Sequence, residues 1–68
     1  MHWTDALELC NEILLDAEDV PERGTDFAAS VCVKVESMQI WIAENECVTE
    51  AMLEALHNMH AGVKKWLH

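Results

Sequence analysis

Apolar residues recur every three or four positions along most of this chain, which is the period of an α-helix that buries one face. Two polar segments interrupt the pattern. "DVPERGT" at 19–25 holds the only proline and one of the two glycines, and "ENECVT" lies at 44–49. Both compositions favour a turn or a helix end. We therefore predict helices near 4–18, 25–45 and 49–67, and an all-α fold.

Residues suited to helix ends stand at these boundaries. Thr4, Thr25 and Thr49 open the predicted helices, where a threonine hydroxyl can accept a hydrogen bond from a free backbone N–H. Asn45 is suited to end the second helix. The closest approach to a strand pattern, "VCVKV" at 31–35, is too short to outweigh its helical flanks.

Each predicted helix has one apolar stripe wide enough to face a core. At about 100° per residue, the stripes consist of Trp3, Ala6, Leu7, Cys10, Ile13, Leu14 and Ala17; of Phe27, Val31, Val35, Met38, Trp41 and Ile42; and of Val48, Met52, Ala55, Leu56, Met59, Val63 and Trp66. Short connections make neighbouring helices antiparallel. The sequence therefore predicts a single helical domain, residues 1–68, folded as an antiparallel three-helix bundle.

The predicted helix 25–45 has a second apolar face. Ala29, Val33, Ile40 and Ala43 lie roughly opposite its core stripe, with Cys32 beside them. One explanation is that this helix is the central helix of the bundle and is half-covered on both sides. The alternatives are a homodimer interface and a patch that binds another protein, with Val33 and Ile40 as its large apolar side chains.

Charge is the strongest compositional feature. Thirteen acidic residues face four basic ones, for a net charge of −9 at pH 7. All thirteen acids lie within residues 5–54, where Arg23 and Lys34 are the only bases, so that this segment has a net charge of −11. A surface of this kind repels nucleic acid and anionic membranes, and it attracts a basic protein. We therefore expect no direct nucleic-acid binding and no membrane binding.

Five acids form a row along the first predicted helix and just beyond it. They recur at spacings of three and four, opposite the core stripe, and are termed the acidic ridge: Asp5, Glu8, Glu12, Asp16 and Asp19. Neighbouring carboxylates lie roughly 5–6 Å apart, which is near the spacing of successive phosphates in a nucleic-acid strand. The ridge is either a solvated face or a binding site for a basic groove.

Glu54 and His57 have the Glu-x-x-His spacing of carboxylate-bridged metal sites, and His60 follows. With Met59 in the core stripe, we expect all three residues to face outward, and no core stripe offers an acid to complete such a site. His57 and His60 could share a surface metal ion only with a ligand from outside the chain. We expect no native metal and no other cofactor.

Other chemical motifs are sparse. The chain has no glycine-rich phosphate loop and no Cys-x-x-Cys, so we expect no enzymatic activity. Cys10, Cys32 and Cys47 form an odd set without a close pair, which favours free thiols in a reducing compartment. No signal peptide is visible, and no apolar run approaches the ~20 residues of a membrane span. We therefore expect a cytoplasmic protein.

A short, acidic, cysteine-containing, all-helical chain without a catalytic motif resembles the small accessory proteins of phages and mobile elements, such as anti-CRISPR and anti-restriction inhibitors. The resemblance covers the whole chain through its size and composition, and it assigns no residue. It implies a protein of the host-cell cytoplasm that binds a basic, nucleic-acid-handling protein or nucleoprotein complex, in some cases by mimicking the charge of nucleic acid.

The leading hypothesis is a non-enzymatic interaction protein that binds and inhibits a basic partner through the acidic ridge, Val33 and Ile40. The first alternative is a structural or regulatory homo-oligomer joined through the second apolar face of helix 25–45. The second is a small metal- or redox-binding protein that uses His57, His60 and a cysteine.

Overall fold

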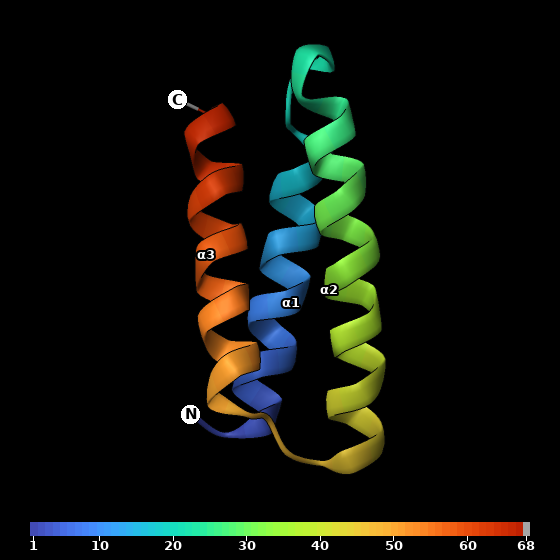
Figure 1. Ribbon diagram of the computed structural model, residues 1–68, viewed down its shortest axis with the longest axis vertical. Coiled ribbons are helices and arrows are strands. Elements are labelled where there is room, and N and C mark those ends of the chain that lie inside the picture. Colours follow the sequence, from blue (N-terminus) through green and yellow to red (C-terminus); the bar gives the residue numbers. More distant parts are fainter. Residues whose placement is uncertain (68) are drawn as a thin grey trace.

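The computed structural model describes residues 1–67 and contains three α-helices packed as a bundle (Figure 1). α1 spans Trp3–Glu18, α2 spans Thr25–Asn45, α3 spans Glu50–Leu67, and a 3-10 turn, η1, spans Glu22–Gly24 between α1 and α2. Consecutive helices run antiparallel, and residues 1–67 contain no strand. The predicted all-α three-helix bundle is confirmed, with each helix boundary within one residue of its expected position.

α1 is the central helix of the bundle. It packs along both α2 and α3, whereas α2 and α3 touch each other along a much shorter line (Figure 1). The buried face of α1 includes the small residues Ala6, Cys10 and Ala17, and small side chains at a contact let neighbouring helices approach closely. The explanation that helix 25–45 is the central one is therefore wrong.

The core consists of side chains from all three helices: Ala6, Leu9, Cys10, Ile13, Val31, Val35, Ile42, Leu56 and Val63. Most members of the predicted stripes are buried or pack against this cluster. Leu9 was not expected there. It is buried because α1 has a neighbour on two sides, which widens its buried arc beyond a single stripe.

Phe27 and Trp41, both expected in the core, are instead 36% and 39% exposed. They lie about 80° and 120° around α2 from the buried Val35, on the side where α2 meets α3 only briefly. Ala28, which was not in the predicted stripe, takes an inner position on α2 and is buried. The buried face of α2 is thus rotated toward α1.

The helix starts differ in how they are capped. The Thr49 hydroxyl accepts a hydrogen bond from the Met52 N–H at 3.1 Å, as expected for α3. At α1 the cap is His2, whose Nδ1 accepts from the Thr4 N–H at 3.2 Å, so Thr4 lies inside the helix. Thr25 makes no side-chain cap, because η1 leads directly into α2 and places Gly24 at the cap position.

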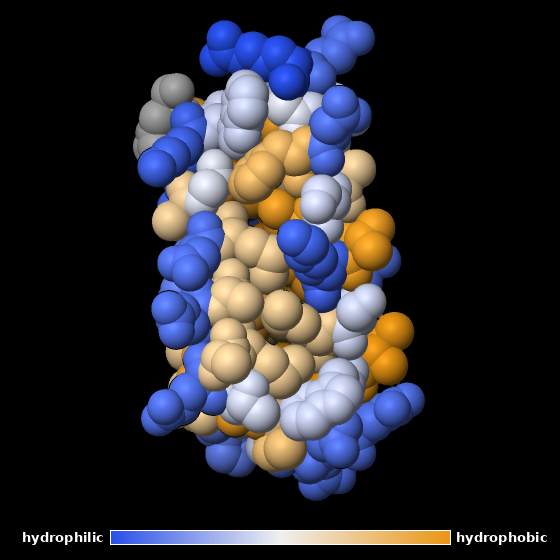
Figure 2. All heavy atoms as spheres, viewed as in Figure 1, coloured by the Kyte–Doolittle hydropathy of each residue, from blue (hydrophilic) through white to orange (hydrophobic). Residues whose placement is uncertain are grey.

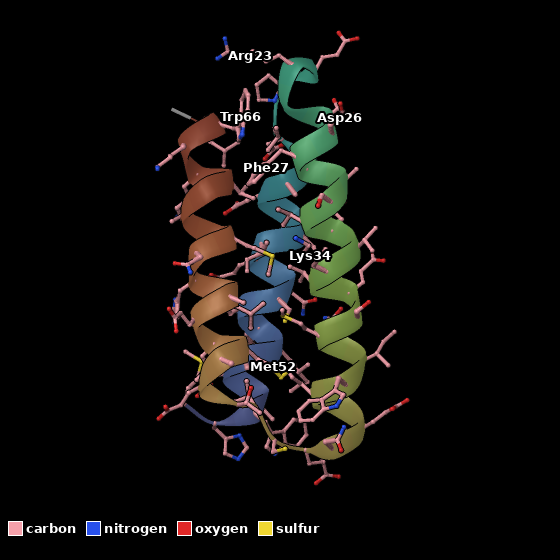
Figure 3. All side chains as sticks on the ribbon, in the orientation of Figure 1. Arg23, Asp26, Phe27, Lys34, Met52 and Trp66 are labelled. Carbon is pink, nitrogen blue, oxygen red and sulfur yellow. The ribbon has the colours of Figure 1, made fainter. Side chains whose placement is uncertain are left out.

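Tight packing closes the end of the bundle where α1 leads into α2. A Cβ atom on Gly24 would lie 2.9 Å from the Trp66 ring, and one on Gly62 would lie 2.8 Å from the tip of the Phe27 ring. Figure 3 shows Phe27 and Trp66 at this end, with Arg23 above them. The Arg23 guanidinium stands 5.6 Å from the centre of the Trp66 ring. Within residues 1–67, no helix combines the length and apolar character that a membrane crossing requires.

Candidate functional site

The acidic ridge lies on the face of α1 turned away from its neighbours. Four of its five members are exposed: Asp5, Glu8, Glu12 and Asp19. Asp19 ends α1, where its backbone N–H bonds back to the Ala17 and Asp16 carbonyls. No lysine or arginine within residues 1–67 forms an ion pair with any member of the ridge. The structure therefore presents four free carboxylates along one helix.

Asp16 differs from the rest of the ridge because it pairs with α3. The His60 Nε2 lies 3.2 Å from an Asp16 carboxylate oxygen, and the two side chains are 17% and 33% exposed. The expectation of outward-facing residues is correct for Glu54 and His57, which are exposed, and wrong for His60. His60 follows Leu56 by one helical turn, so it shares the side of α3 that faces α1.

The contact between Asp16 and His60 also affects the possibility that His57 and His60 share a surface metal ion. The His60 ring nitrogen Nε2 already faces the Asp16 carboxylate, while His57 remains exposed. In the part of the chain that the structure describes, no three His, Cys, Asp or Glu residues lie together in a way that could hold a metal ion. The same part contains no pocket. His57 and His60 thus gain no third protein ligand from residues 1–67.

The second apolar face of α2 is exposed to solvent. Val33 is 65% exposed and Ile40 is 60% exposed. Together with their neighbours on this side of the helix they define the outer face of α2: Ala29, Val33, Glu36, Ile40, Ala43 and Glu44. Figure 2 shows strongly hydrophobic side chains protruding along the α2 edge of the molecule. Within residues 1–67, Val33 and Ile40 thus keep more than half of their surface open to solvent.

Acidic residues alternate with the apolar ones on this outer face. Glu36 follows Val33 by three residues and precedes Ile40 by four, so it neighbours both on the helix surface. Glu44 follows Ile40 by four residues. The outer face of α2 therefore combines hydrophobic side chains with negative charge.

Cys32 lies at the border between this face and α1. Its thiol pKa is raised, chiefly by burial and further by the negative charges of Glu36 and Glu18. One negative charge from each helix therefore acts on the Cys32 thiol. Burial also raises the pKa of the Cys10 thiol, although a backbone hydrogen bond partly offsets the effect. Cys10 is a core residue with little thiolate character, and all three cysteines are free.

The seam between α2 and α3 is a third surface, which the sequence analysis did not anticipate. Figure 2 shows a moderately hydrophobic strip along it, and Figure 3 places Lys34 on its α2 side. Phe27, Lys34 and Trp41 are spaced seven residues apart and therefore lie on one line along α2. A lysine between two aromatic residues at this spacing indicates the edge of a core, and it was a signal available in the sequence.

Two of these three surfaces, the acidic ridge and the outer face of α2, are exposed and carry only negative charge. The acidic ridge is purely charged, whereas the outer face of α2 is charged and apolar. The seam between α2 and α3 is mainly apolar and continues into the core. In comparisons with known proteins, the chain matches no protein-family model, no curated protein and no solved structure.

Proposed function

We propose that this protein is a non-enzymatic interaction module that binds a basic, nucleic-acid-handling protein or complex and blocks it, in the manner of anti-CRISPR and anti-restriction inhibitors. The observation that carries the proposal is the acidic ridge. Its carboxylates at Asp5, Glu8, Glu12 and Asp19 are exposed, and no lysine or arginine within residues 1–67 pairs with them.

The ridge has a physical cost to the isolated protein. Like charges one helical turn apart destabilise a helix by about 0.2–0.5 kcal/mol per pair. A basic partner would turn this repulsion into attraction. From Asp5 to Asp19 the chain rises by about 21 Å along the helix axis, which matches about six nucleotides of one strand in a duplex.

In this proposal the ridge occupies the groove that otherwise holds a nucleic-acid backbone. The net charge of −9 attracts a basic surface from a distance and speeds association. Each carboxylate then accepts hydrogen bonds from lysine or arginine side chains that ordinarily contact phosphate. Inhibition follows from occupancy, and no covalent step is required.

The test is an affinity series in salt against the partner captured from the native host. Binding by the wild type should weaken as salt rises, because screening over about 8–10 Å acts first on exposed charges. The double variant Glu8→Lys with Glu12→Lys should bind at least about tenfold more weakly at low salt, mainly through slower association. The variant should stay folded, and its free energy of unfolding should rise by a few tenths of a kcal/mol, since the new lysines lie beside Asp5 and Asp16.

A matched control separates the effect of the acidic ridge on binding from the effect of the net charge. Glu50→Lys with Glu54→Lys makes the same change at the same spacing on exposed positions of α3. We expect this control to weaken binding much less than the ridge variant. Equal losses from both variants would mean that only the total charge matters. A ridge variant that binds as tightly as the wild type would refute the role of the ridge.

A further inference from the structure

The outer face of α2 has two large apolar side chains that the fold does not use. Val33 and Ile40 are seven residues apart and so lie two turns apart on one line of the helix. Both are more than half exposed, whereas the inner residues Val35 and Ile42 of the same helix are fully buried. Leu15 on α1 is as exposed as Val33, but it has no apolar companion at helical spacing.

The charge around this apolar line is of one sign. Glu36 lies between Val33 and Ile40, Glu44 follows Ile40 by one turn, and Asp26 precedes Val33 by two turns. The only base on α2 is Lys34, which lies about 100° around the helix from Val33. A ligand that covers the outer face must therefore meet carboxylates with basic groups.

A second copy of this chain fits that requirement poorly. Glu36 stands midway between the two apolar side chains, so pairing α2 with itself brings the two Glu36 carboxylates together in either direction. Like charges placed opposite each other at an interface oppose the association. The repulsion between two chains with a net charge of −9 each acts in the same sense.

We propose that the outer face of α2 docks an amphipathic helix of the partner whose apolar residues recur every seven positions and whose flanking residues are lysine or arginine. This inference rests on the proposed function, since it takes the partner to be basic. From Ala29 to Ala43 the helix rises by about 21 Å, which accommodates about four turns of such a partner helix. Val33 and Ile40 supply the apolar contact, and Glu36 and Glu44 pair with the basic side chains.

The experiment uses the full chain and two synthetic peptides of about 18 residues, or five turns of helix. One peptide has leucines on one helical face and lysines elsewhere. The other has the same composition in an order that forms no apolar face. Binding is measured by calorimetry, and the contact surface is mapped by amide chemical-shift changes in the labelled protein. We expect the amphipathic peptide to bind at least about tenfold more tightly and to shift amides along Ala29–Ala43.

Variants with matched controls identify the side chains responsible. The double variant Val33→Ser with Ile40→Ser should weaken binding of the amphipathic peptide at least about tenfold. The control Leu15→Ser removes an equally exposed apolar side chain and should leave binding unchanged. Glu36→Gln with Glu44→Gln should weaken binding and flatten its salt dependence. Glu8→Gln with Glu12→Gln makes the same charge change on the acidic ridge and should have a smaller effect. Circular dichroism checks that every variant keeps its fold.

Three outcomes would overturn the inference, and they can be told apart. If both basic peptides bind alike and shift amides along α1, the acidic ridge is the docking site and the proposed function stands without the α2 face. If neither peptide binds, the inference is refuted, and the proposed function is decided separately by the salt series against the captured partner. If the wild type alone sediments as a dimer that Val33→Ser with Ile40→Ser dissociates, the outer face of α2 is a homodimer interface.

Discussion

α1 and α2 divide their apolar and charged residues in different ways. On α1 the buried residues lie on one side and the acidic ridge lies on the other. On α2 the apolar residues lie on two sides, and only the side with Val31, Val35 and Ile42 is buried. Yet the helix with the narrower apolar surface, α1, is the one that packs against two neighbours.

The difference shows that apolar abundance does not locate the centre of a small bundle. α1 takes the centre with small residues such as Ala6, Cys10 and Ala17, which let both other helices come close. The large side chains Val33 and Ile40 on α2 stay outside. The surplus apolar surface of α2 therefore stays exposed to solvent, and it is the surface on which we propose that a partner helix docks.

The largest expected effect compares two isoleucines on α2 that lie two residues apart. Ile42 is fully buried and Ile40 is 60% exposed. We expect Ile42→Ala to reduce the free energy of unfolding by about 2–5 kcal/mol, and Ile40→Ala to change it by less than about 0.5 kcal/mol. Urea denaturation followed by tryptophan fluorescence measures both. A large loss from Ile40→Ala would show that the outer face of α2 is covered in solution.

A smaller effect concerns the one ridge residue that the fold does use. His60→Ala removes the hydrogen bond to Asp16 between α3 and α1 and should cost about 1 kcal/mol of unfolding free energy. His57→Ala changes an exposed residue of the same type on the same helix and should cost less than about 0.5 kcal/mol. Thermal or urea unfolding distinguishes them, and equal costs would contradict the pairing.

The smallest expected effect concerns the charges around Cys32, on the side of α2 that borders α1. The carboxylate of Glu36 contributes to the raised pKa of the Cys32 thiol, so less thiolate is present at a given pH than for an ordinary cysteine. Glu36→Gln should lower this pKa, increase the thiolate fraction at pH 8 and speed alkylation of Cys32, on the order of twofold. Glu44→Gln serves as the control because residue 44 is three turns away along α2. Mass spectrometry resolves the three cysteines, and an unchanged Cys32 rate would contradict the assigned cause.

Helix number, type and boundaries were predictable because local signals decide them. The proline and glycine of the first connection and the threonine at position 49 mark helix ends without reference to the rest of the molecule. Periodicity likewise identified the acidic ridge and the exposed line through Val33 and Ile40. Both patterns depend on one helix alone.

The order of the helices in space was not predictable in this way. Which helix lies between the other two depends on how faces of different helices fit, and periodicity within one helix contains no such information. This is why Leu9 was missed and why His60 was expected in solvent. Phe27 and Trp41 were placed in the core although Lys34, on the same line of α2, marked that line as its edge. The His60–Asp16 contact joins residues that are 44 positions apart, so no local signal could reveal it.

The central position of α1 also determines which part of the molecule opens most easily. α3 packs mainly on α1 and touches α2 along a shorter line, so it can detach without disturbing the longer α1–α2 contact. Amides of α3 should then exchange with solvent deuterium faster than those of α1 and α2, as one cooperative unit. Each such opening would expose the α1 surface around Leu9 and would free Asp16 from His60, so that the acidic ridge briefly gains a fifth unpaired carboxylate.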